Sequence, residues 1–360
     1  MNNGEKSNLF PATVLEQLRT EITTSHKPLY FFDDDPDGVA AFLYLYGYKK
    51  DGRGILVKAR PELNEFFAKI VTNHQPDRII ILDIALMNDY FREKIRTPIS
   101  WIDHHDPQEK LPKNISYYNP KKYAPDSYIP TSQVAYEALH AEEGMHELSW
   151  VAAAGCIGDY VLPSFLTELN EQFPDLLRGH HDLDMIRYHS PLGTITRMFS
   201  FLTMGATADA NNNMKILTRV TDPRELTEGT TSRGRFLIKQ FKKIDKQYQQ
   251  ILDEALATPI KDKVLFFKYA ENKISVTTEL ANELSILNKK CLIIVARERN
   301  GECKMSLRYT NELRAALEKA LEHVDGHGGG HAMACGASVK SSDIERFLEI
   351  LKDELGLGKK

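Results

Sequence analysis

The stretch Phe32-Asp33-Asp34-Asp35-Pro36-Asp37-Gly38 decides the predicted fold of this chain. It follows a short apolar run at residues 29–32 and precedes residues 39–49, which have helical length and period. The same alternation continues downstream, with strands expected at 55–57, 78–82 and 99–102 and helices at 61–73, 88–96 and 131–143. Wholly apolar strands that alternate with helices are typical of βαβ units around a parallel sheet covered on both faces.

Acidic residues follow three of these predicted strands. Asp33, Asp35 and Asp37 follow the first strand, Asp83 ends the third, and Asp103-His104-His105-Asp106 ends the fourth. The carboxyl ends of parallel strands lie at one edge of the sheet, where the binding crevice of an open sheet forms. A single strand-end Asp is usually a helix cap or a turn residue. Three such sites in βαβ order instead favour a shared function.

A fourth acidic position, Asp159 in Gly155-Cys156-Ile157-Gly158-Asp159, follows a helix-like run at 151–154. Carboxylates gathered at one edge repel one another unless cations compensate them. Carboxylates with one imidazole suit Mn²⁺, and Mg²⁺ less well. We therefore expect bound Mn²⁺, with Mg²⁺ or Co²⁺ as substitutes. The pair His180-His181 has no apolar strand before it and is expected to lie in a loop.

The second half of the chain has a different texture. Residues 207–213 are small and polar and are expected to form a loop, whereas 233–256 form a long amphipathic helix. Beyond it, a smaller α/β domain is predicted, with Asn300-Gly301 as a hairpin turn. Its strands are expected at 263–269, 291–296 and 303–309, and its helices at 278–288, 311–323 and 342–355. The predicted division is a catalytic domain at 1–205, a helical connector at 206–258 and a second domain at 259–360.

Composition sets the broad class. An apolar content of 42% and a charged content of 27% are those of a globular protein, and no run is apolar enough to span a membrane. Residues 1–10 lack the apolar core of a signal peptide. The cysteines lie far apart, which argues against a zinc-finger motif or a disulfide framework and favours a reducing cytoplasm: Cys156, Cys291, Cys303 and Cys335. The net charge of −4 still permits a basic groove for nucleic acid.

In order, these motifs resemble those of the DHH phosphoesterases. The matching stretches are 33–38, Asp83, 103–105 and 158–159, and Gly326 to Gly336 resembles the glycine-rich signature of the DHH-associated C-terminal domain. The opening motif is similar to that of the RecJ-like nucleases, since Phe31 stands where other branches begin with His. The resemblance implies an active site in a cleft between the two domains.

The resemblance also implies a dinuclear centre. Asp33 and Asp35 would hold one ion, while Asp37, His104 and Asp159 would hold the other. Asp83 would bridge the two ions. His105 would contact the phosphate or protonate the leaving oxygen. Its alternative role is to lie beside a metal ligand and orient it. Asp83, His104 and His105 are thus the candidate catalytic residues.

Substrate contacts are expected from the second domain. Gly328, Gly329 and Gly330 would present backbone N–H groups to an anion, with His331 at the edge, although three glycines are equally consistent with a tight turn. Arg308 is the candidate for a bidentate phosphate contact; its alternative is an exposed strand arginine.

Three functions follow as hypotheses. The first is a Mn²⁺-dependent exonuclease that acts on single-stranded DNA or RNA or on short oligonucleotides. The second is a small-nucleotide phosphodiesterase or phosphatase, acting on a cyclic dinucleotide, a very short RNA or a phosphoadenosine nucleotide. The third is a replication or repair scaffold without chemistry, against which the six intact ligand positions count. A monomer or homodimer is expected, with replication or repair proteins as partners.

Overall fold

The computed structural model describes residues 10–58, 62–270 and 274–357. The chain divides into two compact units, Met1–Phe241 and Lys242–Lys360. Each unit contains one five-stranded sheet, so the predicted mixed α/β class is confirmed. The predicted domain boundaries and the predicted cleft stay predictions.

A parallel sheet forms the centre of the N-terminal unit, with strand order β2-β1-β4-β6-β7. All four neighbouring pairs are parallel, as the alternation of strands and helices predicts. The strands are β1 (Pro28–Asp33), β2 (Arg53–Val57), β4 (Arg78–Leu82), β6 (Ile99–Ile102) and β7 (Ile115–Tyr118). A separate two-stranded sheet pairs β3 (Glu62–Leu63) with β5 (Leu86–Met87).

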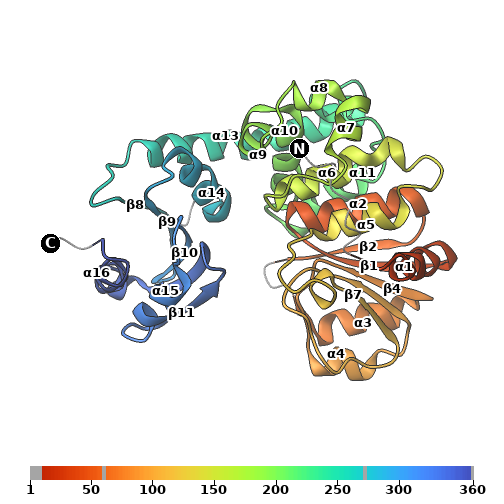
Figure 1. Ribbon diagram of the computed structural model, residues 1–360, viewed down its shortest axis with the longest axis horizontal. Helices are drawn as coiled ribbons and strands as arrows, with labels where there is room; N and C mark the ends of the chain where they lie inside the picture. The colour runs from red at the N-terminus through yellow and green to blue at the C-terminus, as the bar shows by residue number, and fades with distance from the viewer. Residues whose placement is uncertain (1–9, 59–61, 271–273, 358–360) are drawn as a thin grey trace. The chain divides into compact units, whose positions relative to one another are not determined.

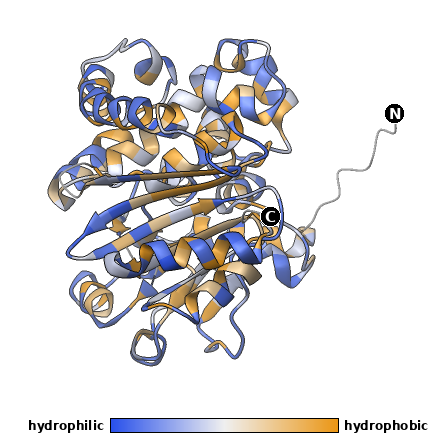
Figure 2. Ribbon diagram, turned by 90° about the vertical axis from the view of Figure 1, so that its left-hand side faces the viewer, coloured by the Kyte–Doolittle hydropathy of each residue, from blue (hydrophilic) through white to orange (hydrophobic). Residues whose placement is uncertain are grey.

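Helices cover both faces of this sheet (Figure 1). On one face, α3 (Glu65–His74) and α4 (Asp89–Lys94) pack on alternate strand residues such as Phe31, Ile81 and Trp101. The expected start of α3 at Pro61 lies outside the described residues. The other face carries α2 (Pro36–Lys49) and α5 (Thr131–Leu139), with α1 (Ala12–Thr24) beside them and α6 (Ser149–Gly158) behind them. Figure 2 shows hydrophobic and hydrophilic residues interspersed along the outer helices.

The residues expected to form a loop at 207–213 are instead the start of α11 (Thr207–Leu217), so that prediction was wrong. Ala210, Asn213, Met214 and Leu217 are buried at helical spacing. The pattern is hard to recognise because Ala210 is small and Asn213 is polar; the Asn213 amide donates to the Leu202 carbonyl at 2.9 Å. The neighbouring helices are α7 (Leu166–Gln172), α8 (Pro174–Leu177), α9 (Leu183–His189), α10 (Pro191–Thr203) and α12 (Arg224–Thr227).

The predicted long helix is present as α13 (Ser232–Leu256), and the boundary between the two compact units falls within it. Its first turn is tied to α12 by Glu225, which is 2% exposed. Arg233 donates to the two Glu225 carboxylate oxygens at 2.6 and 2.9 Å, and the Thr221 amide donates at 3.1 Å.

A mixed sheet forms the centre of the C-terminal unit, with strand order β11-β12-β10-β9-β8. The pair β8–β9 is parallel and the others are antiparallel. The strands are β8 (Val264–Ala270), β9 (Leu292–Arg299), β10 (Glu302–Arg308), β11 (Gly326–Gly330) and β12 (Ala334–Lys340). Asn300 and Gly301 both have positive φ, 52° and 79°, as the predicted hairpin turn between β9 and β10 requires.

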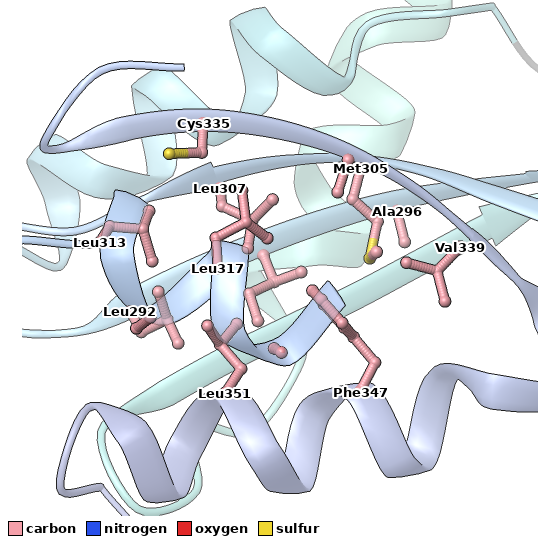
Figure 3. Close-up of a cluster of buried hydrophobic side chains, with 14 of the residues drawn as sticks. Leu292, Ala296, Met305, Leu307, Leu313, Leu317, Cys335, Val339, Phe347 and Leu351 are labelled. Carbon is pink, nitrogen blue, oxygen red and sulfur yellow. The ribbon is translucent and has the colours of Figure 1, made fainter. Parts of the chain in front are cut away.

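The core of this unit lies between one face of the mixed sheet and two helices, α15 (Arg314–Leu321) and α16 (Ile344–Glu354). Leu317, Phe347 and Leu351 project from these helices toward Leu307 and Leu292 of the sheet (Figure 3). A third helix, α14 (Thr277–Leu287), packs against strands β9 and β10 of this sheet.

Within residues 10–58, 62–270 and 274–357, none of the helices combines the length and the apolar character that crossing a membrane would demand.

The Glu225 carboxylate predicts a pH-dependent contribution to stability. Burial alone would raise the pKa of Glu225, but hydrogen bonds from Arg233, Thr231 and the Thr221 amide lower it from 4.5 to about 2. The ionised form therefore stabilises the fold above about pH 4.5, and this stabilisation is lost as the pH falls toward 2. Glu225→Gln should lower the free energy of unfolding by about 3 kcal/mol at pH 7 and by less at pH 3.

Denaturant unfolding followed by tryptophan fluorescence measures this, because both tryptophans, Trp101 and Trp150, lie in the N-terminal unit. The matched control is Glu228→Gln, since Glu228 is exposed. Equal unfolding free energies for the Glu225 variant and the wild type at pH 7 would contradict the assignment.

Candidate metal centre

The acidic residues predicted to converge do so at the carboxyl edge of the parallel sheet. Three overlapping groups each bring their ligand atoms within 4.8 Å of one another. The groups are Asp33–Asp35–Asp83, Asp37–His104–Asp159 and Asp83–His104–His105. Asp83 and His104 each belong to two groups, so the cluster is continuous.

The first acidic motif is shaped by the junction of β1 and α2. Asp33 ends β1, and Asp35 caps α2 by accepting a hydrogen bond from the Gly38 amide at 2.9 Å. A Cβ on Gly38 would lie 2.9 Å from the backbone N and O of Asp33. Glycine is needed there so that the helix can begin this close to the strand. The motif thereby holds Asp33 and Asp35 side by side.

Asp37 is fully buried and is held by the start of α5. The Thr131 amide donates to Oδ2 at 2.7 Å, and the Ser132 amide donates to Oδ1 at 2.9 Å. A carboxylate is stabilised there because the first N–H groups of a helix lack partners within the helix. Burial and Asp83 nevertheless raise the pKa of Asp37 to about 6. Asp37 therefore joins α2 to α5 as well as facing the cluster.

Asp83 lies at the centre of the cluster and has an unusual backbone. Its φ is +59°, in the left-handed region, directly after the last residue of β4. The Asp83 amide still donates to the Ile102 carbonyl at 3.0 Å, so the residue stays attached to the sheet. Left-handed Asp is uncommon and is found most often where a function constrains the backbone.

His104 offsets part of the negative charge. Its Nε2 lies 3.2 Å from Asp83 Oδ1 and 3.4 Å from Asp159 Oδ2. Burial alone would lower the pKa of His104, but the hydrogen bond and the charge of Asp83 raise it to about 10. Burial likewise opposes the low pKa of Asp83, which His104 brings to about 2. The negative charge of the cluster thus favours the protonated, cationic form of His104.

The other carboxylates show the repulsion directly. Burial first, and then the neighbouring carboxylates, raise the pKa of Asp33, Asp35 and Asp159 well above 3.8. These groups are hard to ionise together without added positive charge.

His105 is the more accessible histidine, with a side chain that is 38% exposed against 7% for His104. Its Nδ1 lies 2.7 Å from Asp103 Oδ1. Asp103 is fully buried and accepts a hydrogen bond from the Tyr117 hydroxyl at 3.0 Å. Our sequence analysis gave Asp103 no role, although it stands next to the histidines in the motif. The structure shows that Asp103 orients His105.

Asp159 follows the last residue of α6. A Cβ on Gly158 would lie 2.6 Å from the Pro36 side chain, so glycine lets this helix end against the start of α2. Arg187 of α9 donates through Nη1 to the carbonyl oxygens of Ile157 and Gly158, the latter at 2.9 Å. Nothing in the sequence connects Arg187 with Asp159. The loop with His180-His181, as predicted, precedes α9 and contributes no residue to the cluster groups.

Tyr128 also escaped the sequence analysis. Its ring centroid lies 5.0 Å from that of His104, and its hydroxyl lies 3.5 Å from Asp159 Oδ2. The residue is 46% exposed. No motif marks it, because it lies in the segment between β7 and α5.

The candidate substrate residues all belong to the C-terminal unit. Gly328, Gly329 and Gly330 form an edge strand with β12 instead of a tight turn. A Cβ on Gly328 or Gly330 would lie 2.5 Å from a backbone oxygen of β12, whereas Gly329 has open space. The Arg308 Nε donates to Asn282 Oδ1 of α14 at 2.6 Å. His331 is exposed just beyond β11.

Comparisons with known proteins bear on both units. Residues 261–356 match the family model of the DHHA1 domain. No curated protein sequence matches the chain.

Solved structures are similar over nearly the whole chain. RecJ from Thermus thermophilus, in complex with Mn²⁺, has a TM-score of 0.68 and 15% identity and covers 98% of this chain. This chain spans only 56% of that RecJ. An exonuclease RecJ bound to manganese has a TM-score of 0.57 and 14% identity, covering 98% of this chain and 96% of its own.

A pGpG-specific phosphodiesterase, PggH from Vibrio cholerae, is also similar, with a TM-score of 0.51 and 12% identity, covering 92% of this chain and 100% of its own. At these identities, the likeness is one of fold. Residues 261–356 of the C-terminal unit are thus similar to the DHHA1 domain, and the chain as a whole has the fold of the RecJ structures.

Proposed function

We propose that this chain is a metal-dependent phosphoesterase that hydrolyses phosphodiester bonds in single-stranded DNA or RNA or in short oligonucleotides. The observation that carries this proposal is the cluster of five carboxylates and His104 at the edge of the parallel sheet. Such a site suits phosphoryl chemistry, since cations held there offset the charge of a phosphate.

The donor set fits two divalent cations. Asp33 and Asp35 would hold one, Asp37, His104 and Asp159 the other, and Asp83 both. Asp33 and Asp35 fall within one group of neighbouring ligand atoms, and Asp37, His104 and Asp159 form another, which supports this assignment. Burial and, after it, the neighbouring carboxylates raise the pKa of Asp33, Asp35 and Asp159, and such ions would offset both effects. Oxygen donors with one imidazole favour Mn²⁺. When bound, the pair would neutralise charge on the phosphate and make water more acidic.

His105 would handle the proton of the leaving group. Asp103 accepts from Nδ1, which directs the opposite nitrogen, Nε2, away from this partner. Burial would lower the pKa of His105, but the hydrogen bond to Asp103 and the charge of Asp83 raise it above its ordinary value. In hydrolysis, the oxygen of a water molecule would form a new P–O bond and lose one proton to solvent, while Nε2 would donate its proton to the oxygen that leaves as the old P–O bond breaks. The products are a phosphomonoester and a free hydroxyl.

The C-terminal unit would contribute phosphate contacts. Arg308 offers a guanidinium, and His331 offers an exposed imidazole beyond the glycine strand. Gly329 is the glycine whose Cβ position is open, so a ligand can approach the backbone there. Gly328 and Gly330 would support this strand geometry, since β12 leaves no space for side chains at these positions.

A second candidate is hydrolysis of small nucleotides, including cyclic dinucleotides. The same ligand set serves this reaction, and the fold is shared with the Vibrio protein described as a pGpG-specific phosphodiesterase. A turnover panel with Mn²⁺ separates the candidates: labelled single strands from two to about 20 nucleotides, cyclic dinucleotides and pyrophosphate. Rates that rise with strand length support the exonuclease, and rates confined to dinucleotides support the alternative.

The central experiment is metal dependence. Turnover should require added divalent cation, be abolished by excess chelator and be faster with Mn²⁺ than with Mg²⁺. Asp83→Asn should lower turnover by more than about a hundredfold and reduce metal content, because Asp83 belongs to two ligand groups. His105→Ala should slow turnover while retaining both ions.

The control is Asp106→Asn, since the Asp106 side chain is 92% exposed and pairs with Lys121. Full turnover in excess chelator, with metal analysis showing no retained ion, would overturn the proposal. Normal rate and two ions in Asp83→Asn would refute the bridging role alone.

Arg187 should affect the metal centre without touching it. Arg187→Lys keeps the charge but loses the guanidinium that binds the carbonyls before Asp159. We expect about ten- to a hundredfold weaker binding of one ion and a matching loss of rate. Calorimetric metal titration measures this, with the exposed Arg178→Lys as control. Unchanged affinity for both ions would contradict the positioning role.

Substitutions in the C-terminal unit should spare metal binding. Arg308→Ala and Gly329→Val should lower kcat/KM by about ten- to a hundredfold, through loss of a charged phosphate contact or of backbone approach. The contrast is Gly328→Ala, which should destabilise the unit because its Cβ would collide with the Gly336 carbonyl. Wild-type kinetics in Arg308→Ala and Gly329→Val would mean that this unit does not contact substrate.

A further inference from the structure

We infer that Tyr128 is a substrate-contacting residue: its ring stacks on the base or sugar beside the reacting phosphate, and its hydroxyl hydrogen-bonds that phosphate. This inference rests on the proposed function for the identity of the substrate. Its own evidence is the position of the ring at the cluster and its partial exposure.

The segment that carries Tyr128 is anchored at both ends. It begins after a 3₁₀ turn at Pro120–Lys122 and ends at Thr131, whose amide binds Asp37 at 2.7 Å. Tyr128 lies three residues before this contact. Its ring is tilted by 60° against His104, with the centroids 5.0 Å apart. The ring is thus placed by the same contacts that hold the cluster together.

Tyr128 is partly exposed to solvent and also contacts the acidic cluster. The residue is 46% exposed, yet its hydroxyl reaches Asp159 at 3.5 Å. An O–H group is a donor, and 3.5 Å is long for a hydrogen bond between oxygens. A phosphate oxygen placed closer would be the better acceptor.

The exposed part of the ring offers what a nucleotide needs. Aromatic side chains bind successive bases of single strands by stacking, with little preference for sequence. The other exposed aromatic residues in the described parts of the chain do not serve this site in the same way: Phe66 packs on Phe67 at 5.2 Å, Tyr123 packs on Phe10 at 5.4 Å, and Tyr90 lies near Lys94. Tyr128 is the exposed aromatic residue that contacts both His104 and Asp159.

The test separates the ring from the hydroxyl. Tyr128→Phe keeps the ring, Tyr128→Leu removes it, and Tyr123→Leu is the control on the same segment. Each protein is assayed with Mn²⁺ on a dinucleotide and on a matched phosphodiester with abasic sugars. Dissociation constants for both ligands are measured separately with Ca²⁺, so that binding is known independently of turnover. Metal content and thermal stability accompany every variant.

The expected result is a preference of the wild type for the dinucleotide over the abasic ligand. Tyr128→Leu should remove this preference by lowering kcat/KM on the dinucleotide about five- to a hundredfold. Tyr128→Phe should keep the preference and lose about tenfold in rate on both substrates. Tyr123→Leu should match the wild type.

Unchanged preference in Tyr128→Leu overturns the inference while the proposed function stands. A second outcome also overturns the inference: Tyr128→Leu loses metal or thermal stability but still binds the dinucleotide more tightly than the abasic ligand. The role of Tyr128 is then structural. If the wild type hydrolyses no phosphodiester, the proposed function fails. The dissociation constants measured with Ca²⁺ then decide whether Tyr128 contacts the nucleotide. Weaker binding of the dinucleotide alone in Tyr128→Leu supports the contact; equal binding, or no binding by the wild type, overturns it.

Discussion

The mutual repulsion of five buried or half-buried carboxylates at one sheet edge is the constraint on which the N-terminal unit depends. Burial first, and then the neighbouring carboxylates, raise the pKa of Asp33, Asp35 and Asp159, so their joint ionisation is unfavourable. Two features offset part of this negative charge. The His104 imidazole lies between Asp83 and Asp159, and the first backbone amides of α5 donate hydrogen bonds to Asp37. A site that keeps this many carboxylates together is prepared for cations rather than for stability.

Close backbone approach is the second requirement. The start of α2 meets the end of β1 at Gly38, and the end of α6 meets Pro36 at Gly158. Arg187 then satisfies the carbonyls at the end of α6, beside Asp159. These contacts explain why the ligand groups overlap.

The two units use different sheets for different tasks. The parallel sheet brings strand ends to one edge and so gathers side chains that are distant in sequence. The mixed sheet of the C-terminal unit instead exposes an edge strand of glycines, where a ligand meets backbone more than side chain. The carboxylates and Arg308, the proposed phosphate contact, therefore belong to different sheets.

The sequence by itself determined the parallel α/β arrangement, the long helix α13 and the identity of the residues that converge. Apolar runs and strand-end carboxylates are local signals, and the order of parallel strands carries them to one edge. Only the tertiary structure placed Asp103 behind His105, Arg187 behind Asp159 and Tyr128 beside His104. Only the structure showed that residues 207–213 begin α11 and that the glycine run forms a strand. These outcomes depend on contacts between segments far apart in the chain, and a hydrogen bond from a distant helix leaves no periodicity in the sequence of either partner.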